Sequence, residues 1–411
     1  MRTITQVVKN DLCTGCGTCV GICPQSALEM IKSEVKGIYV PKLHETRCTD
    51  CGICFKSCPG YSVNFSQLNK EFFSKEPTDI LLGNSTKCYV GYATDHETRY
   101  NSASGGLVTA LLTFALEEGM IDGALVTRMN KEKPLEPGPF IARTKNEIIS
   151  ASKSKYCPVA VCSALREIVK ENGKFAVVGL PCHIHGVRKA ETVNKRLREK
   201  IVLHFGIFCS HSPSFLATEF LLWKLGIEKE NIVKIDYRGG GWPGGMSILL
   251  RSNNKIFIPY LHQLYYGGTF GSYFYPNRCT LCYDFSAELA DISFGDAWNL
   301  SKNGMGVSLI ISRDKAGDEL LKKARAKGKI ELEAVSTEKV IRSQEGSLYF
   351  KKDSLAERLF LMKIFGKKTP FYGFQFHKQH IDPANLIQSA LFYRSIYVSS
   401  KRHQYLWNLL R

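Results

Sequence analysis

The sequence lacks a long apolar run, and its first residues lack the apolar core of a secretory signal. A membrane-spanning helix needs about 18 consecutive apolar residues, whereas the best candidate, Leu107 to Leu116, is followed by two glutamates. Residues 1–12 contain no apolar core either, and so they do not resemble a signal peptide. We therefore expect no transmembrane segment and a cytoplasmic protein.

Acidic residues are scarce relative to basic ones. The chain has 38 Asp and Glu against 55 Lys and Arg, a net charge of +17. This excess favours an anionic partner, whether nucleic acid, a membrane surface, a phosphate-bearing cofactor or an acidic protein. Lys and Arg are dispersed and no helix-turn-helix or other reader motif is present, so nucleic acid is not expected. An acidic redox protein or a polyanionic coenzyme fits better.

Cysteine, in contrast, is abundant. A chain of 411 residues with 44% hydrophobic and 23% charged residues is an ordinary globular protein of two or three domains, which excludes disorder, collagen and coiled coil. A core of that size does not need disulfides. In a reducing compartment, 15 cysteines therefore indicate metal or redox sites.

Eight cysteines form two copies of the pattern C-x2-C-x2-C-x3-C-P within the first 59 residues. In bacterial ferredoxins, three close thiolates of one run and the fourth of the other hold each [4Fe-4S] cluster. The repeat thus predicts one cluster on Cys13, Cys16, Cys19 and Cys58, and a second on Cys48, Cys51, Cys54 and Cys23. Gly15, Gly17 and Gly52 suit the tight loops. Zinc ribbons or a disulfide cage leave the duplicated order unexplained.

Seven cysteines remain. Cys279 and Cys282 form a C-x2-C pair, whereas Cys182 and Cys209 each follow a β-rich apolar run. The ends of such strands carry site residues in α/β sheets, so these four thiols are candidate ligands of a third cluster. Buried core cysteines are an equally good interpretation of the spacing alone. The other three, which have no partner pattern and are interpreted as core residues, are Cys88, Cys157 and Cys162.

The hydrophobic pattern changes along the chain. A short helix is expected over residues 27–31 and a strand over 37–40, and residues 61–87 have the composition of a linker. Strand-like and helix-like stretches then alternate, which predicts an α/β domain with a largely parallel or mixed sheet. The expected strands are 123–128, 175–179 and 201–209, and the expected helices are 105–118 and 159–171.

Two later segments have unusual compositions. Residues 236–275 are rich in glycine and aromatic residues, which favours a mobile loop over a flat ligand, although a surface turn without function is also compatible. The last seventy residues have a mainly helical pattern. Their end, Tyr397 to Leu410, is basic and aromatic, as in a packing arm or a partner site.

A candidate phosphate loop precedes the apolar helix. Asn101-Ser102-Ala103-Ser104-Gly105-Gly106 ends in two glycines that permit close approach of a ligand. Ser104 is expected to cap the helix, whose N-terminal N–H groups suit a pyrophosphate. A plain helix cap has the same sequence features.

Together the motifs resemble those of the beta-subunit family of coenzyme F420 hydrogenases and dehydrogenases, which also includes ferredoxin-dependent chlorophyllide reductases. The resemblance covers about residues 88–331, with the ferredoxin-type module in front. Its motifs are Ser-Ala-Ser-Gly-Gly (102–106), Ser-Lys-Tyr (154–156), Val-Val-Gly-Leu-Pro-Cys (177–182), Phe-Gly-Ile-Phe-Cys-Ser (205–210), Cys279-x2-Cys282 and Ala-Asp-Ile-Ser-Phe-Gly-Asp (290–296). Relatives often carry an amide or apolar residue where His183 and His185 stand, and we interpret these histidines as packing residues.

The resemblance implies FAD and a third [4Fe-4S] cluster ligated by Cys182, Cys209, Cys279 and Cys282. It places the pyrophosphate near residues 104–106, and Lys155 and Tyr156 near the flavin. On that placement Lys155 is a candidate to stabilise negative charge on reduced flavin, and Asp291 and Asp296 are candidates to orient the ring or relay a proton, whereas structural caps are the commoner role of acidic turn residues. The complete set of implied flavin contacts is Ser104, Gly105, Gly106, Thr109, Lys155, Tyr156, Gly179 and Pro181. No nucleophile or catalytic triad is expected, because the cofactors carry the chemistry.

The expected architecture is an α/β (α+β overall) protein. It comprises a bacterial ferredoxin-like domain (1–65), a linker (66–87), a mixed-sheet α/β flavin-binding domain (88–340) and a C-terminal helical region (341–411). The expected function is an iron–sulfur flavoprotein oxidoreductase that passes electrons between the clusters and a hydride carrier such as coenzyme F420. The alternatives are an electron-transfer subunit of a larger complex, as a hetero- or homo-oligomer, or a ferredoxin-dependent reductase of a pigment or biosynthetic intermediate.

Overall fold

The computed structural model describes residues 4–300, 304–374 and 381–400. Its centre is an eight-stranded sheet of order β13-β3-β12-β11-β7-β6-β4-β5. The four strands β11, β7, β6 and β4 run parallel, and the others join antiparallel. The strands are β3 (Lys87–Ala93), β4 (Gly123–Met129), β5 (Pro137–Ala142), β6 (Phe175–Gly179), β7 (Ile201–Ile207), β11 (Ile292–Asp296), β12 (Ser308–Ser312) and β13 (Ile330–Val335). The predicted mixed α/β sheet is confirmed, with all three predicted strands in it.

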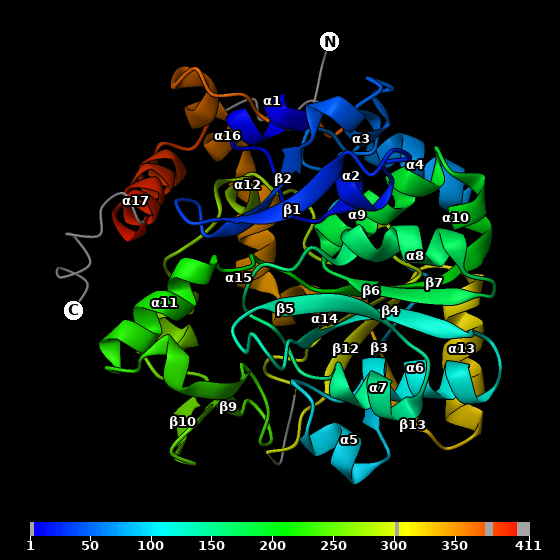
Figure 1. The fold of residues 1–411 in the computed structure, drawn as a ribbon. Helices are drawn as coiled ribbons and strands as arrows, with labels where there is room; N and C mark the ends of the chain where they lie inside the picture. The colour runs from blue at the N-terminus through cyan, green and yellow to red at the C-terminus, as the bar shows by residue number, and fades with distance from the viewer. Residues whose placement is uncertain (1–3, 301–303, 375–380, 401–411) are drawn as a thin grey trace.

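Helices cover both faces of this sheet (Figure 1). On one face lie α6 (Leu107–Glu117), α7 (Lys145–Ser150) and α13 (Lys315–Ala326); α5 (His96–Tyr100) precedes α6. On the other lie the 3₁₀ helix η2 (Val161–Ala164), α8 (Leu165–Lys170), α9 (Pro181–Glu191) and α10 (Lys195–Lys200). The predicted helix over 105–118 is α6, whereas the one predicted over 159–171 is divided between η2 and α8.

The N-terminal module packs over α8 and α9 (Figure 1). It contains α1 (Ile4–Lys9), α2 (Thr18–Gly21), β1 (Leu28–Ser33), β2 (Ile38–Leu43), η1 (Glu45–Arg47) and α3 (Ile53–Lys56). The helix expected over residues 27–31 is wrong, because this segment is strand β1, paired antiparallel with β2 from Leu28↔Leu43 onward. So short a helix has little stability of its own, and pairing with β2 satisfies the backbone instead.

The expected linker is folded. It contains α4 (Phe65–Phe73), which is capped by the Asn64 side chain accepting from Gln67 N at 3.1 Å. Further along, Asn84 is fully buried and its amide donates to Asn69 Oδ1 at 2.8 Å. The polar composition that suggests a linker thus belongs to a cap and a buried amide pair. One hydrophobic core joins residues of the N-terminal module to residues 281–290 and 355–372.

The glycine-rich segment 236–275 is also mostly ordered structure. It contributes to a three-stranded antiparallel sheet of β8 (Ile232–Asp236), β9 (Gly245–Leu250) and β10 (Lys255–Pro259), followed by a π-helical turn (Tyr266–Phe270). The small sheet packs with α11 (Phe215–Lys224), which precedes η3 (Lys229–Asn231). Residues 237–244 form an irregular connection with four glycines at positive φ, and Tyr237 and Arg238 at its start are buried. The mobile loop predicted for the whole segment is therefore wrong.

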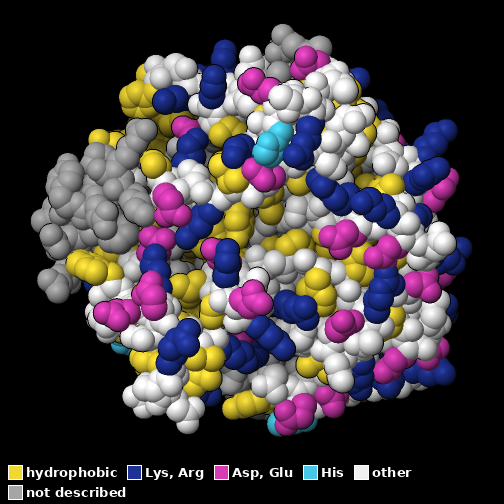
Figure 2. Space-filling model, viewed as in Figure 1, with side chains coloured by type: hydrophobic (Ala, Val, Ile, Leu, Met, Phe, Trp, Pro, Cys, Tyr) yellow, Lys and Arg dark blue, Asp and Glu magenta, His cyan; other side chains and the backbone are white. Residues whose placement is uncertain are grey.

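The described part of the C-terminal region is helical, as predicted. It comprises α14 (Thr337–Ser343), α15 (Glu345–Leu348), a π-helical turn (Tyr349–Asp353), α16 (Leu355–Ile364) and α17 (Pro383–Ser399). Most of the basic, aromatic end from Tyr397 to Leu410 lies outside the described residues. Within the described ranges, none of the helices has the length and apolarity to cross a membrane. On the face in Figure 2, Lys and Arg are interspersed with Asp and Glu rather than gathered in one band.

Candidate functional site

A cavity of about 340 Å³ lies at the carboxyl edge of the parallel strands. Residues at the ends of β4 (Thr127), β6 (Gly179), β7 (Ile207) and β11 (Asp296) line it, together with Ser308 at the start of antiparallel β12. Ligands of open α/β sheets bind at this edge. The volume is within the range of small-molecule and cofactor sites.

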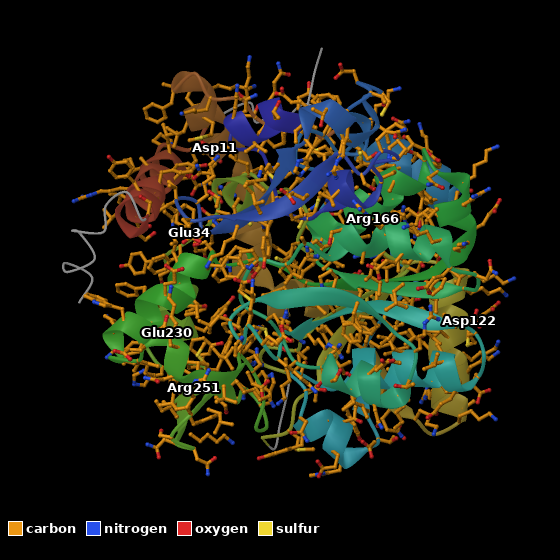
Figure 3. All side chains as sticks on the ribbon, in the orientation of Figure 1. Asp11, Glu34, Asp122, Arg166, Glu230 and Arg251 are labelled. Carbon is orange, nitrogen blue, oxygen red and sulfur yellow. The ribbon has the colours of Figure 1, made fainter. Side chains whose placement is uncertain are left out.

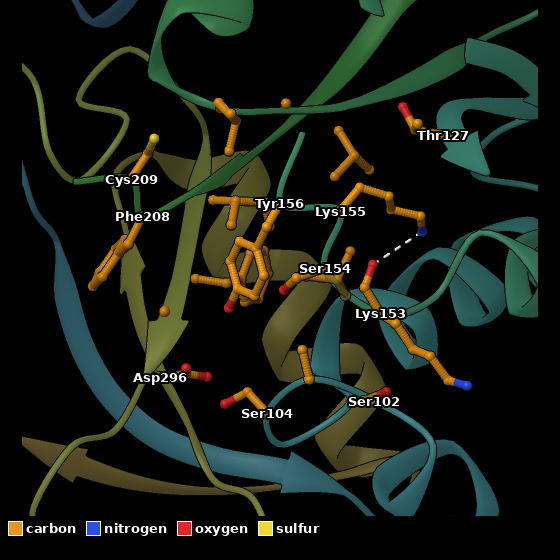
Figure 4. A pocket seen from close by; sticks show the side chains of 18 of the residues that line it. Ser102, Ser104, Thr127, Lys153, Ser154, Lys155, Tyr156, Phe208, Cys209 and Asp296 are labelled. Carbon is orange, nitrogen blue, oxygen red and sulfur yellow. Dashed lines mark hydrogen bonds between the residues drawn. The ribbon is translucent and has the colours of Figure 1, made fainter. Parts of the chain in front are cut away.

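One end of the cavity is lined by polar and basic side chains and the other by aromatic and thiol side chains (Figure 4). Ser102, Ser104 and Lys153 lie at one side, whereas Phe208 and Cys209 lie at the other with Tyr156 between them. Serine hydroxyls and a lysine suit a phosphorylated group, although here the Lys153 ammonium pairs with Asp236 at 3.0 Å and both hydroxyls donate to backbone carbonyls. Aromatic faces suit a flat ring system. The arrangement therefore fits an elongated ligand with an anionic part and an aromatic part.

Most of the sequence-predicted flavin contacts line this cavity. Ser104, Gly106, Thr109, Lys155, Tyr156 and Gly179 do so, whereas Gly105 and Pro181 do not. Asp296, which was predicted as a catalytic residue, also lines the cavity. Ser104 is not the helix cap predicted for it, because the N-cap of α6 is Gly106 in the left-handed region (φ 78°). The Ser104 hydroxyl instead donates to Val307 O at 2.9 Å, and Gly105 N donates to Ser308 Oγ at 3.0 Å. These bonds dock the loop onto β12.

Lys155 holds the segment beside the cavity. Its ammonium donates to the carbonyls of Ala151, Ser152 (2.7 Å) and Lys153 (2.9 Å; dashed in Figure 4). Burial lowers the pKa of Lys155 to about 7, while the three carbonyls favour its charged form. The side chain therefore braces a turn and places a titratable charge beside the cavity.

Arg238 is a central residue that motif reasoning missed. Its guanidinium donates to the Tyr156 hydroxyl at 2.9 Å, to Asp296 Oδ2 at 3.1 Å and to the carbonyl of Ala103. It also lies over the Tyr260 ring, 4.2 Å from the centroid. The side chain is 1% exposed, and carboxylate and phenol oxygens nearby hold its pKa high against burial. One cation thus ties together three segments that line the cavity.

Other lining residues were also missed by the sequence. Tyr260 and Tyr266 stack with centroids 4.6 Å apart, and both belong to the segment interpreted as a mobile loop. His211 is buried, and its Nε2–H donates to Phe270 O at 2.7 Å. Burial lowers the pKa of His211 to about 3, so the ring is neutral. Its Nδ1 has no hydrogen-bond partner within the described ranges. The aromatic-rich composition was the available signal for these residues.

Four thiols gather next to the aromatic end of the cavity. Cys209, Cys279 and Cys282 lie close enough to Cys182 to raise the pKa of its thiol, to which burial contributes most. Cys209 lies both in this group and in the cavity wall. Lys351, 1% exposed, donates to Cys279 O at 3.2 Å. Four thiol side chains grouped in this way suit the all-thiolate ligation of an iron–sulfur cluster, in which the bound thiolates would be balanced by the metal charge.

The N-terminal module contains two more thiol groups. Cys13, Cys16 and Cys58 lie near Cys19, and the pKa of Cys19 is raised by burial and then by their charges. Cys23, Cys48 and Cys51 lie near Cys54, whose pKa is raised in the same way. Each group thus combines three cysteines of one run with the last of the other. Across the described ranges, no three His, Cys, Asp or Glu side chains converge on a point suited to a single metal ion.

The two N-terminal groups differ in depth. Cys16, Cys19 and Cys58 are buried, whereas Cys51 is exposed and Cys48 is half-buried. Cys19 is also near Cys54 of the other group. The thiol groups therefore form a series from the surface inward.

The unassigned polar residues are embedded in the protein interior. His183 Nε2 donates to Val159 O at 3.0 Å, its Nδ1 accepts from Leu180 N at 3.1 Å, and burial lowers its pKa to about 4. His183 also lines the cavity, whereas His185 is buried and pairs with Asp284 at 2.7 Å; that both serve only in packing stays a prediction. Asp291 does not line the cavity, because it is buried with Arg188 and His204. The three spare cysteines, Cys88, Cys157 and Cys162, are buried core residues.

Comparison with known proteins gives matches to both the α/β domain and the cysteine-rich N-terminal module. Residues 88–166 and 172–338 match the N-terminal and C-terminal models of the coenzyme F420 hydrogenase/dehydrogenase beta subunit, and residues 12–61 match a 4Fe-4S dicluster domain. The chain is 30% identical over 300 residues to the coenzyme F420 hydrogenase subunit beta of Methanothermobacter thermautotrophicus, covering 71% of this chain and 100% of that one. The matches define an iron–sulfur protein related to oxidoreductases. It belongs to the coenzyme F420 hydrogenase/dehydrogenase beta-subunit family.

Two further relatives extend the comparison. The coenzyme F420-dependent sulfite reductase of Methanocaldococcus jannaschii is 27% identical over 348 residues, which are 81% of this chain and 49% of that protein. In structure, a chain of the F420-reducing [NiFe] hydrogenase complex from Methanosarcina barkeri matches with a TM-score of 0.56 and 25% identity. The match covers 72% of this chain and 98% of that one.

Proposed function

We propose that this protein is an iron–sulfur flavoprotein that exchanges electrons between a hydride carrier, of which coenzyme F420 is the best candidate, and three [4Fe-4S] clusters. The observation that carries the proposal is the position of Cys209. Its side chain belongs to the four-thiol group and also to the wall of the cavity at the ends of β4, β6, β7 and β11. A redox group in the cavity and a cluster on the thiols are then neighbours.

In this proposal FAD would be held at both ends of the cavity. Ser102, Ser104 and Lys153 would hold the pyrophosphate, and Tyr156 and Phe208 would pack on the ring system. Bound there, FAD supplies the exchange between a hydride, which carries two electrons and one proton, and the single electrons that clusters carry. Arg238 and Lys155 would hold segments of the cavity wall in place through their hydrogen bonds.

The three thiol groups would hold the clusters that carry electrons between the cavity and the protein surface. Cys182, Cys209, Cys279 and Cys282 would hold the third cluster, with Cys13, Cys16, Cys19 and Cys58 on the next and Cys23, Cys48, Cys51 and Cys54 on the outermost. The exposed Cys51 makes the last group the port for a one-electron partner protein. The net charge of +17 favours an acidic partner.

The test is cofactor analysis followed by reduction. Protein purified without oxygen should release FAD, and reduced coenzyme F420 should bleach its flavin absorbance. NADH serves as the comparison donor. If no hydride donor reduces the flavin while dithionite does, the hydride-exchange part of the proposal is wrong.

A second candidate function is that of an electron-transfer subunit whose catalytic partner lies on another chain. It is favoured by the likeness to one chain of the F420-reducing [NiFe] hydrogenase complex. Affinity purification from the native source under anaerobic conditions separates the two. Co-purification of a second redox subunit at equal stoichiometry supports the subunit role, whereas a lone chain active with reduced F420 argues against it.

A further inference from the structure

Helix α9 connects the third thiol group to the N-terminal module. Cys182 lies in its first turn, and Lys189 lies two turns later. The Lys189 ammonium donates to the carbonyls of Cys58, at 2.9 Å, and Ser62, at 2.6 Å. Its charge also faces the Cys16 thiol. A single helix thus bears a ligand candidate of one group and grips the backbone of the other.

Arg278 makes the same connection from a different element. It immediately precedes Cys279 and is 3% exposed. Its Nε donates to Gly60 O at 2.9 Å and its Nη2 to Pro59 O at 3.3 Å, so it holds the segment that follows Cys58. Its Nη1 has no hydrogen-bond partner among the described residues. A buried guanidinium therefore lies between the two thiol groups.

The backbones of the two regions are also in direct contact. Cys162 N donates to Cys16 O at 2.9 Å, and the Cys16 and Cys182 thiols lie within electrostatic range of each other. A Cβ added at Gly186 would lie 2.0 Å from Thr18 Oγ1, beside Cys16. The contact between Gly186 and Thr18 leaves no room for a side chain at position 186. This close packing fixes the distance between α9 and the N-terminal module.

We propose that Lys189 and Arg278 are positioning residues that hold two clusters next to each other. One is the cluster on Cys13, Cys16, Cys19 and Cys58, here called the relay cluster, and the other is the cluster on Cys182, Cys209, Cys279 and Cys282, with which it exchanges electrons directly. The positive charges of Lys189 and Arg278 raise the reduction potential of the relay cluster. The inference rests on the proposed cluster content. Reduction adds one negative charge to a cluster, and a nearby buried cation stabilises that charge. Burial and hydrogen bonding are among the factors by which proteins set cluster potentials.

The test is a redox titration of the full-length, cluster-loaded protein, monitored by EPR with dithionite and mediators. The EPR signal of the cluster on Cys13, Cys16, Cys19 and Cys58, called the relay signal, is identified as the signal that is lost in Cys16→Ser. Lys189→Met and Arg278→Gln should each shift its midpoint to a more negative potential, and the double variant should shift it further. Lys189→Arg keeps the charge and should restore most of the midpoint. Arg251→Gln, on the small sheet far from the module (Figure 3), should leave it unchanged.

A second measurement covers variants that fail to fold. In the unaltered, fully reduced protein, the relay signal should show magnetic coupling to the third cluster, and Cys182→Ser should remove that coupling while the relay signal persists. An unshifted midpoint in both charge variants, or coupling unaffected by Cys182→Ser, overturns the inference. Dithionite needs neither flavin nor hydride donor, so a failure of hydride-dependent reduction, which concerns the proposed function, leaves this result standing.

Discussion

The Arg238 guanidinium lies 3.1 Å from the Asp296 carboxylate, and this contact joins the large sheet to the segment that follows the small one. Asp296 ends β11 in the large sheet, whereas Arg238 follows β8 in the small one. The same guanidinium reaches Tyr156 and the Ala103 carbonyl. The small sheet is thereby fastened to the cavity wall, and the shape of the cavity depends on one buried cation.

Arg238→Leu should therefore empty the cavity as well as destabilise the protein. It leaves the Asp296 carboxylate, whose side chain is 18% exposed, without its cation, and breaking a buried pair of this kind costs about 3 kcal/mol. Chemical denaturation should show a loss of that size, and flavin content should fall. Arg251→Leu removes an exposed guanidinium bound only to the Glu230 carbonyl and is the matched control. Equal losses in both variants would contradict the role of Arg238.

Lys155 should give the folded state a defined pH dependence. Its pKa of about 7 lies below the ordinary value of 10.5, so between these values the folded chain binds fewer protons than the unfolded one. The free energy of unfolding of flavin-free protein should then rise with pH through this window, by at most about 1.4 kcal/mol per pH unit. Lys155→Met should flatten the slope, whereas Lys145→Met at an exposed position should keep it. Identical slopes in all three proteins would refute the assignment.

Cys279→Ser should remove one cluster of three. Iron content should fall from about 12 to about 8 atoms per chain, since each [4Fe-4S] cluster holds four, and the N-terminal EPR signals should persist. Cys88→Ser replaces a buried cysteine outside the thiol groups and should retain all the iron. Unchanged iron in Cys279→Ser would remove this residue from the ligand set.

Gly21→Ala should separate the N-terminal module from η2. A Cβ at Gly21 would lie 1.9 Å from the Cys162 carbonyl oxygen, which is backbone and has little freedom to move. Overpacking of this kind costs about 1–3 kcal/mol, visible as a lower midpoint of thermal unfolding. Gly346→Ala, where the added Cβ meets nothing within 4 Å, should not destabilise. A stable Gly21→Ala protein would show that the contact is loose.

The sequence was most informative where chemistry is tied to spacing. The duplicated cysteine runs predicted the two N-terminal thiol groups. The apolar runs before Cys182 and Cys209 predicted two strands, which the structure shows as the parallel neighbours β6 and β7. Prediction failed where contacts between residues far apart in the sequence determine the secondary structure. Residues 28–31 form a strand by pairing with β2, and β9 of the glycine-rich segment pairs with both β8 and β10.

The roles of Arg238, Lys189 and Arg278 were also hidden in the sequence. Each is a single cation without a motif, and its partners are mostly backbone carbonyls or side chains far away along the chain. Such contacts follow from the packing of segments that are far apart in the sequence. Hydrophobic periodicity predicts the elements that pack but does not show which cation lies at the contact.

The most direct test of the proposed electron route is an anaerobic titration of the fully loaded protein with reduced coenzyme F420, followed together by absorbance and EPR. The account predicts that the flavin absorbance and the EPR signals of the reduced clusters change together. Because each hydride carries two electrons, two electrons should be found on the clusters for each reduced F420 consumed, once the flavin is oxidised again. Flavin that is reduced while every cluster stays EPR-silent, although dithionite reduces the clusters, would contradict the connection between the cavity and the thiol groups.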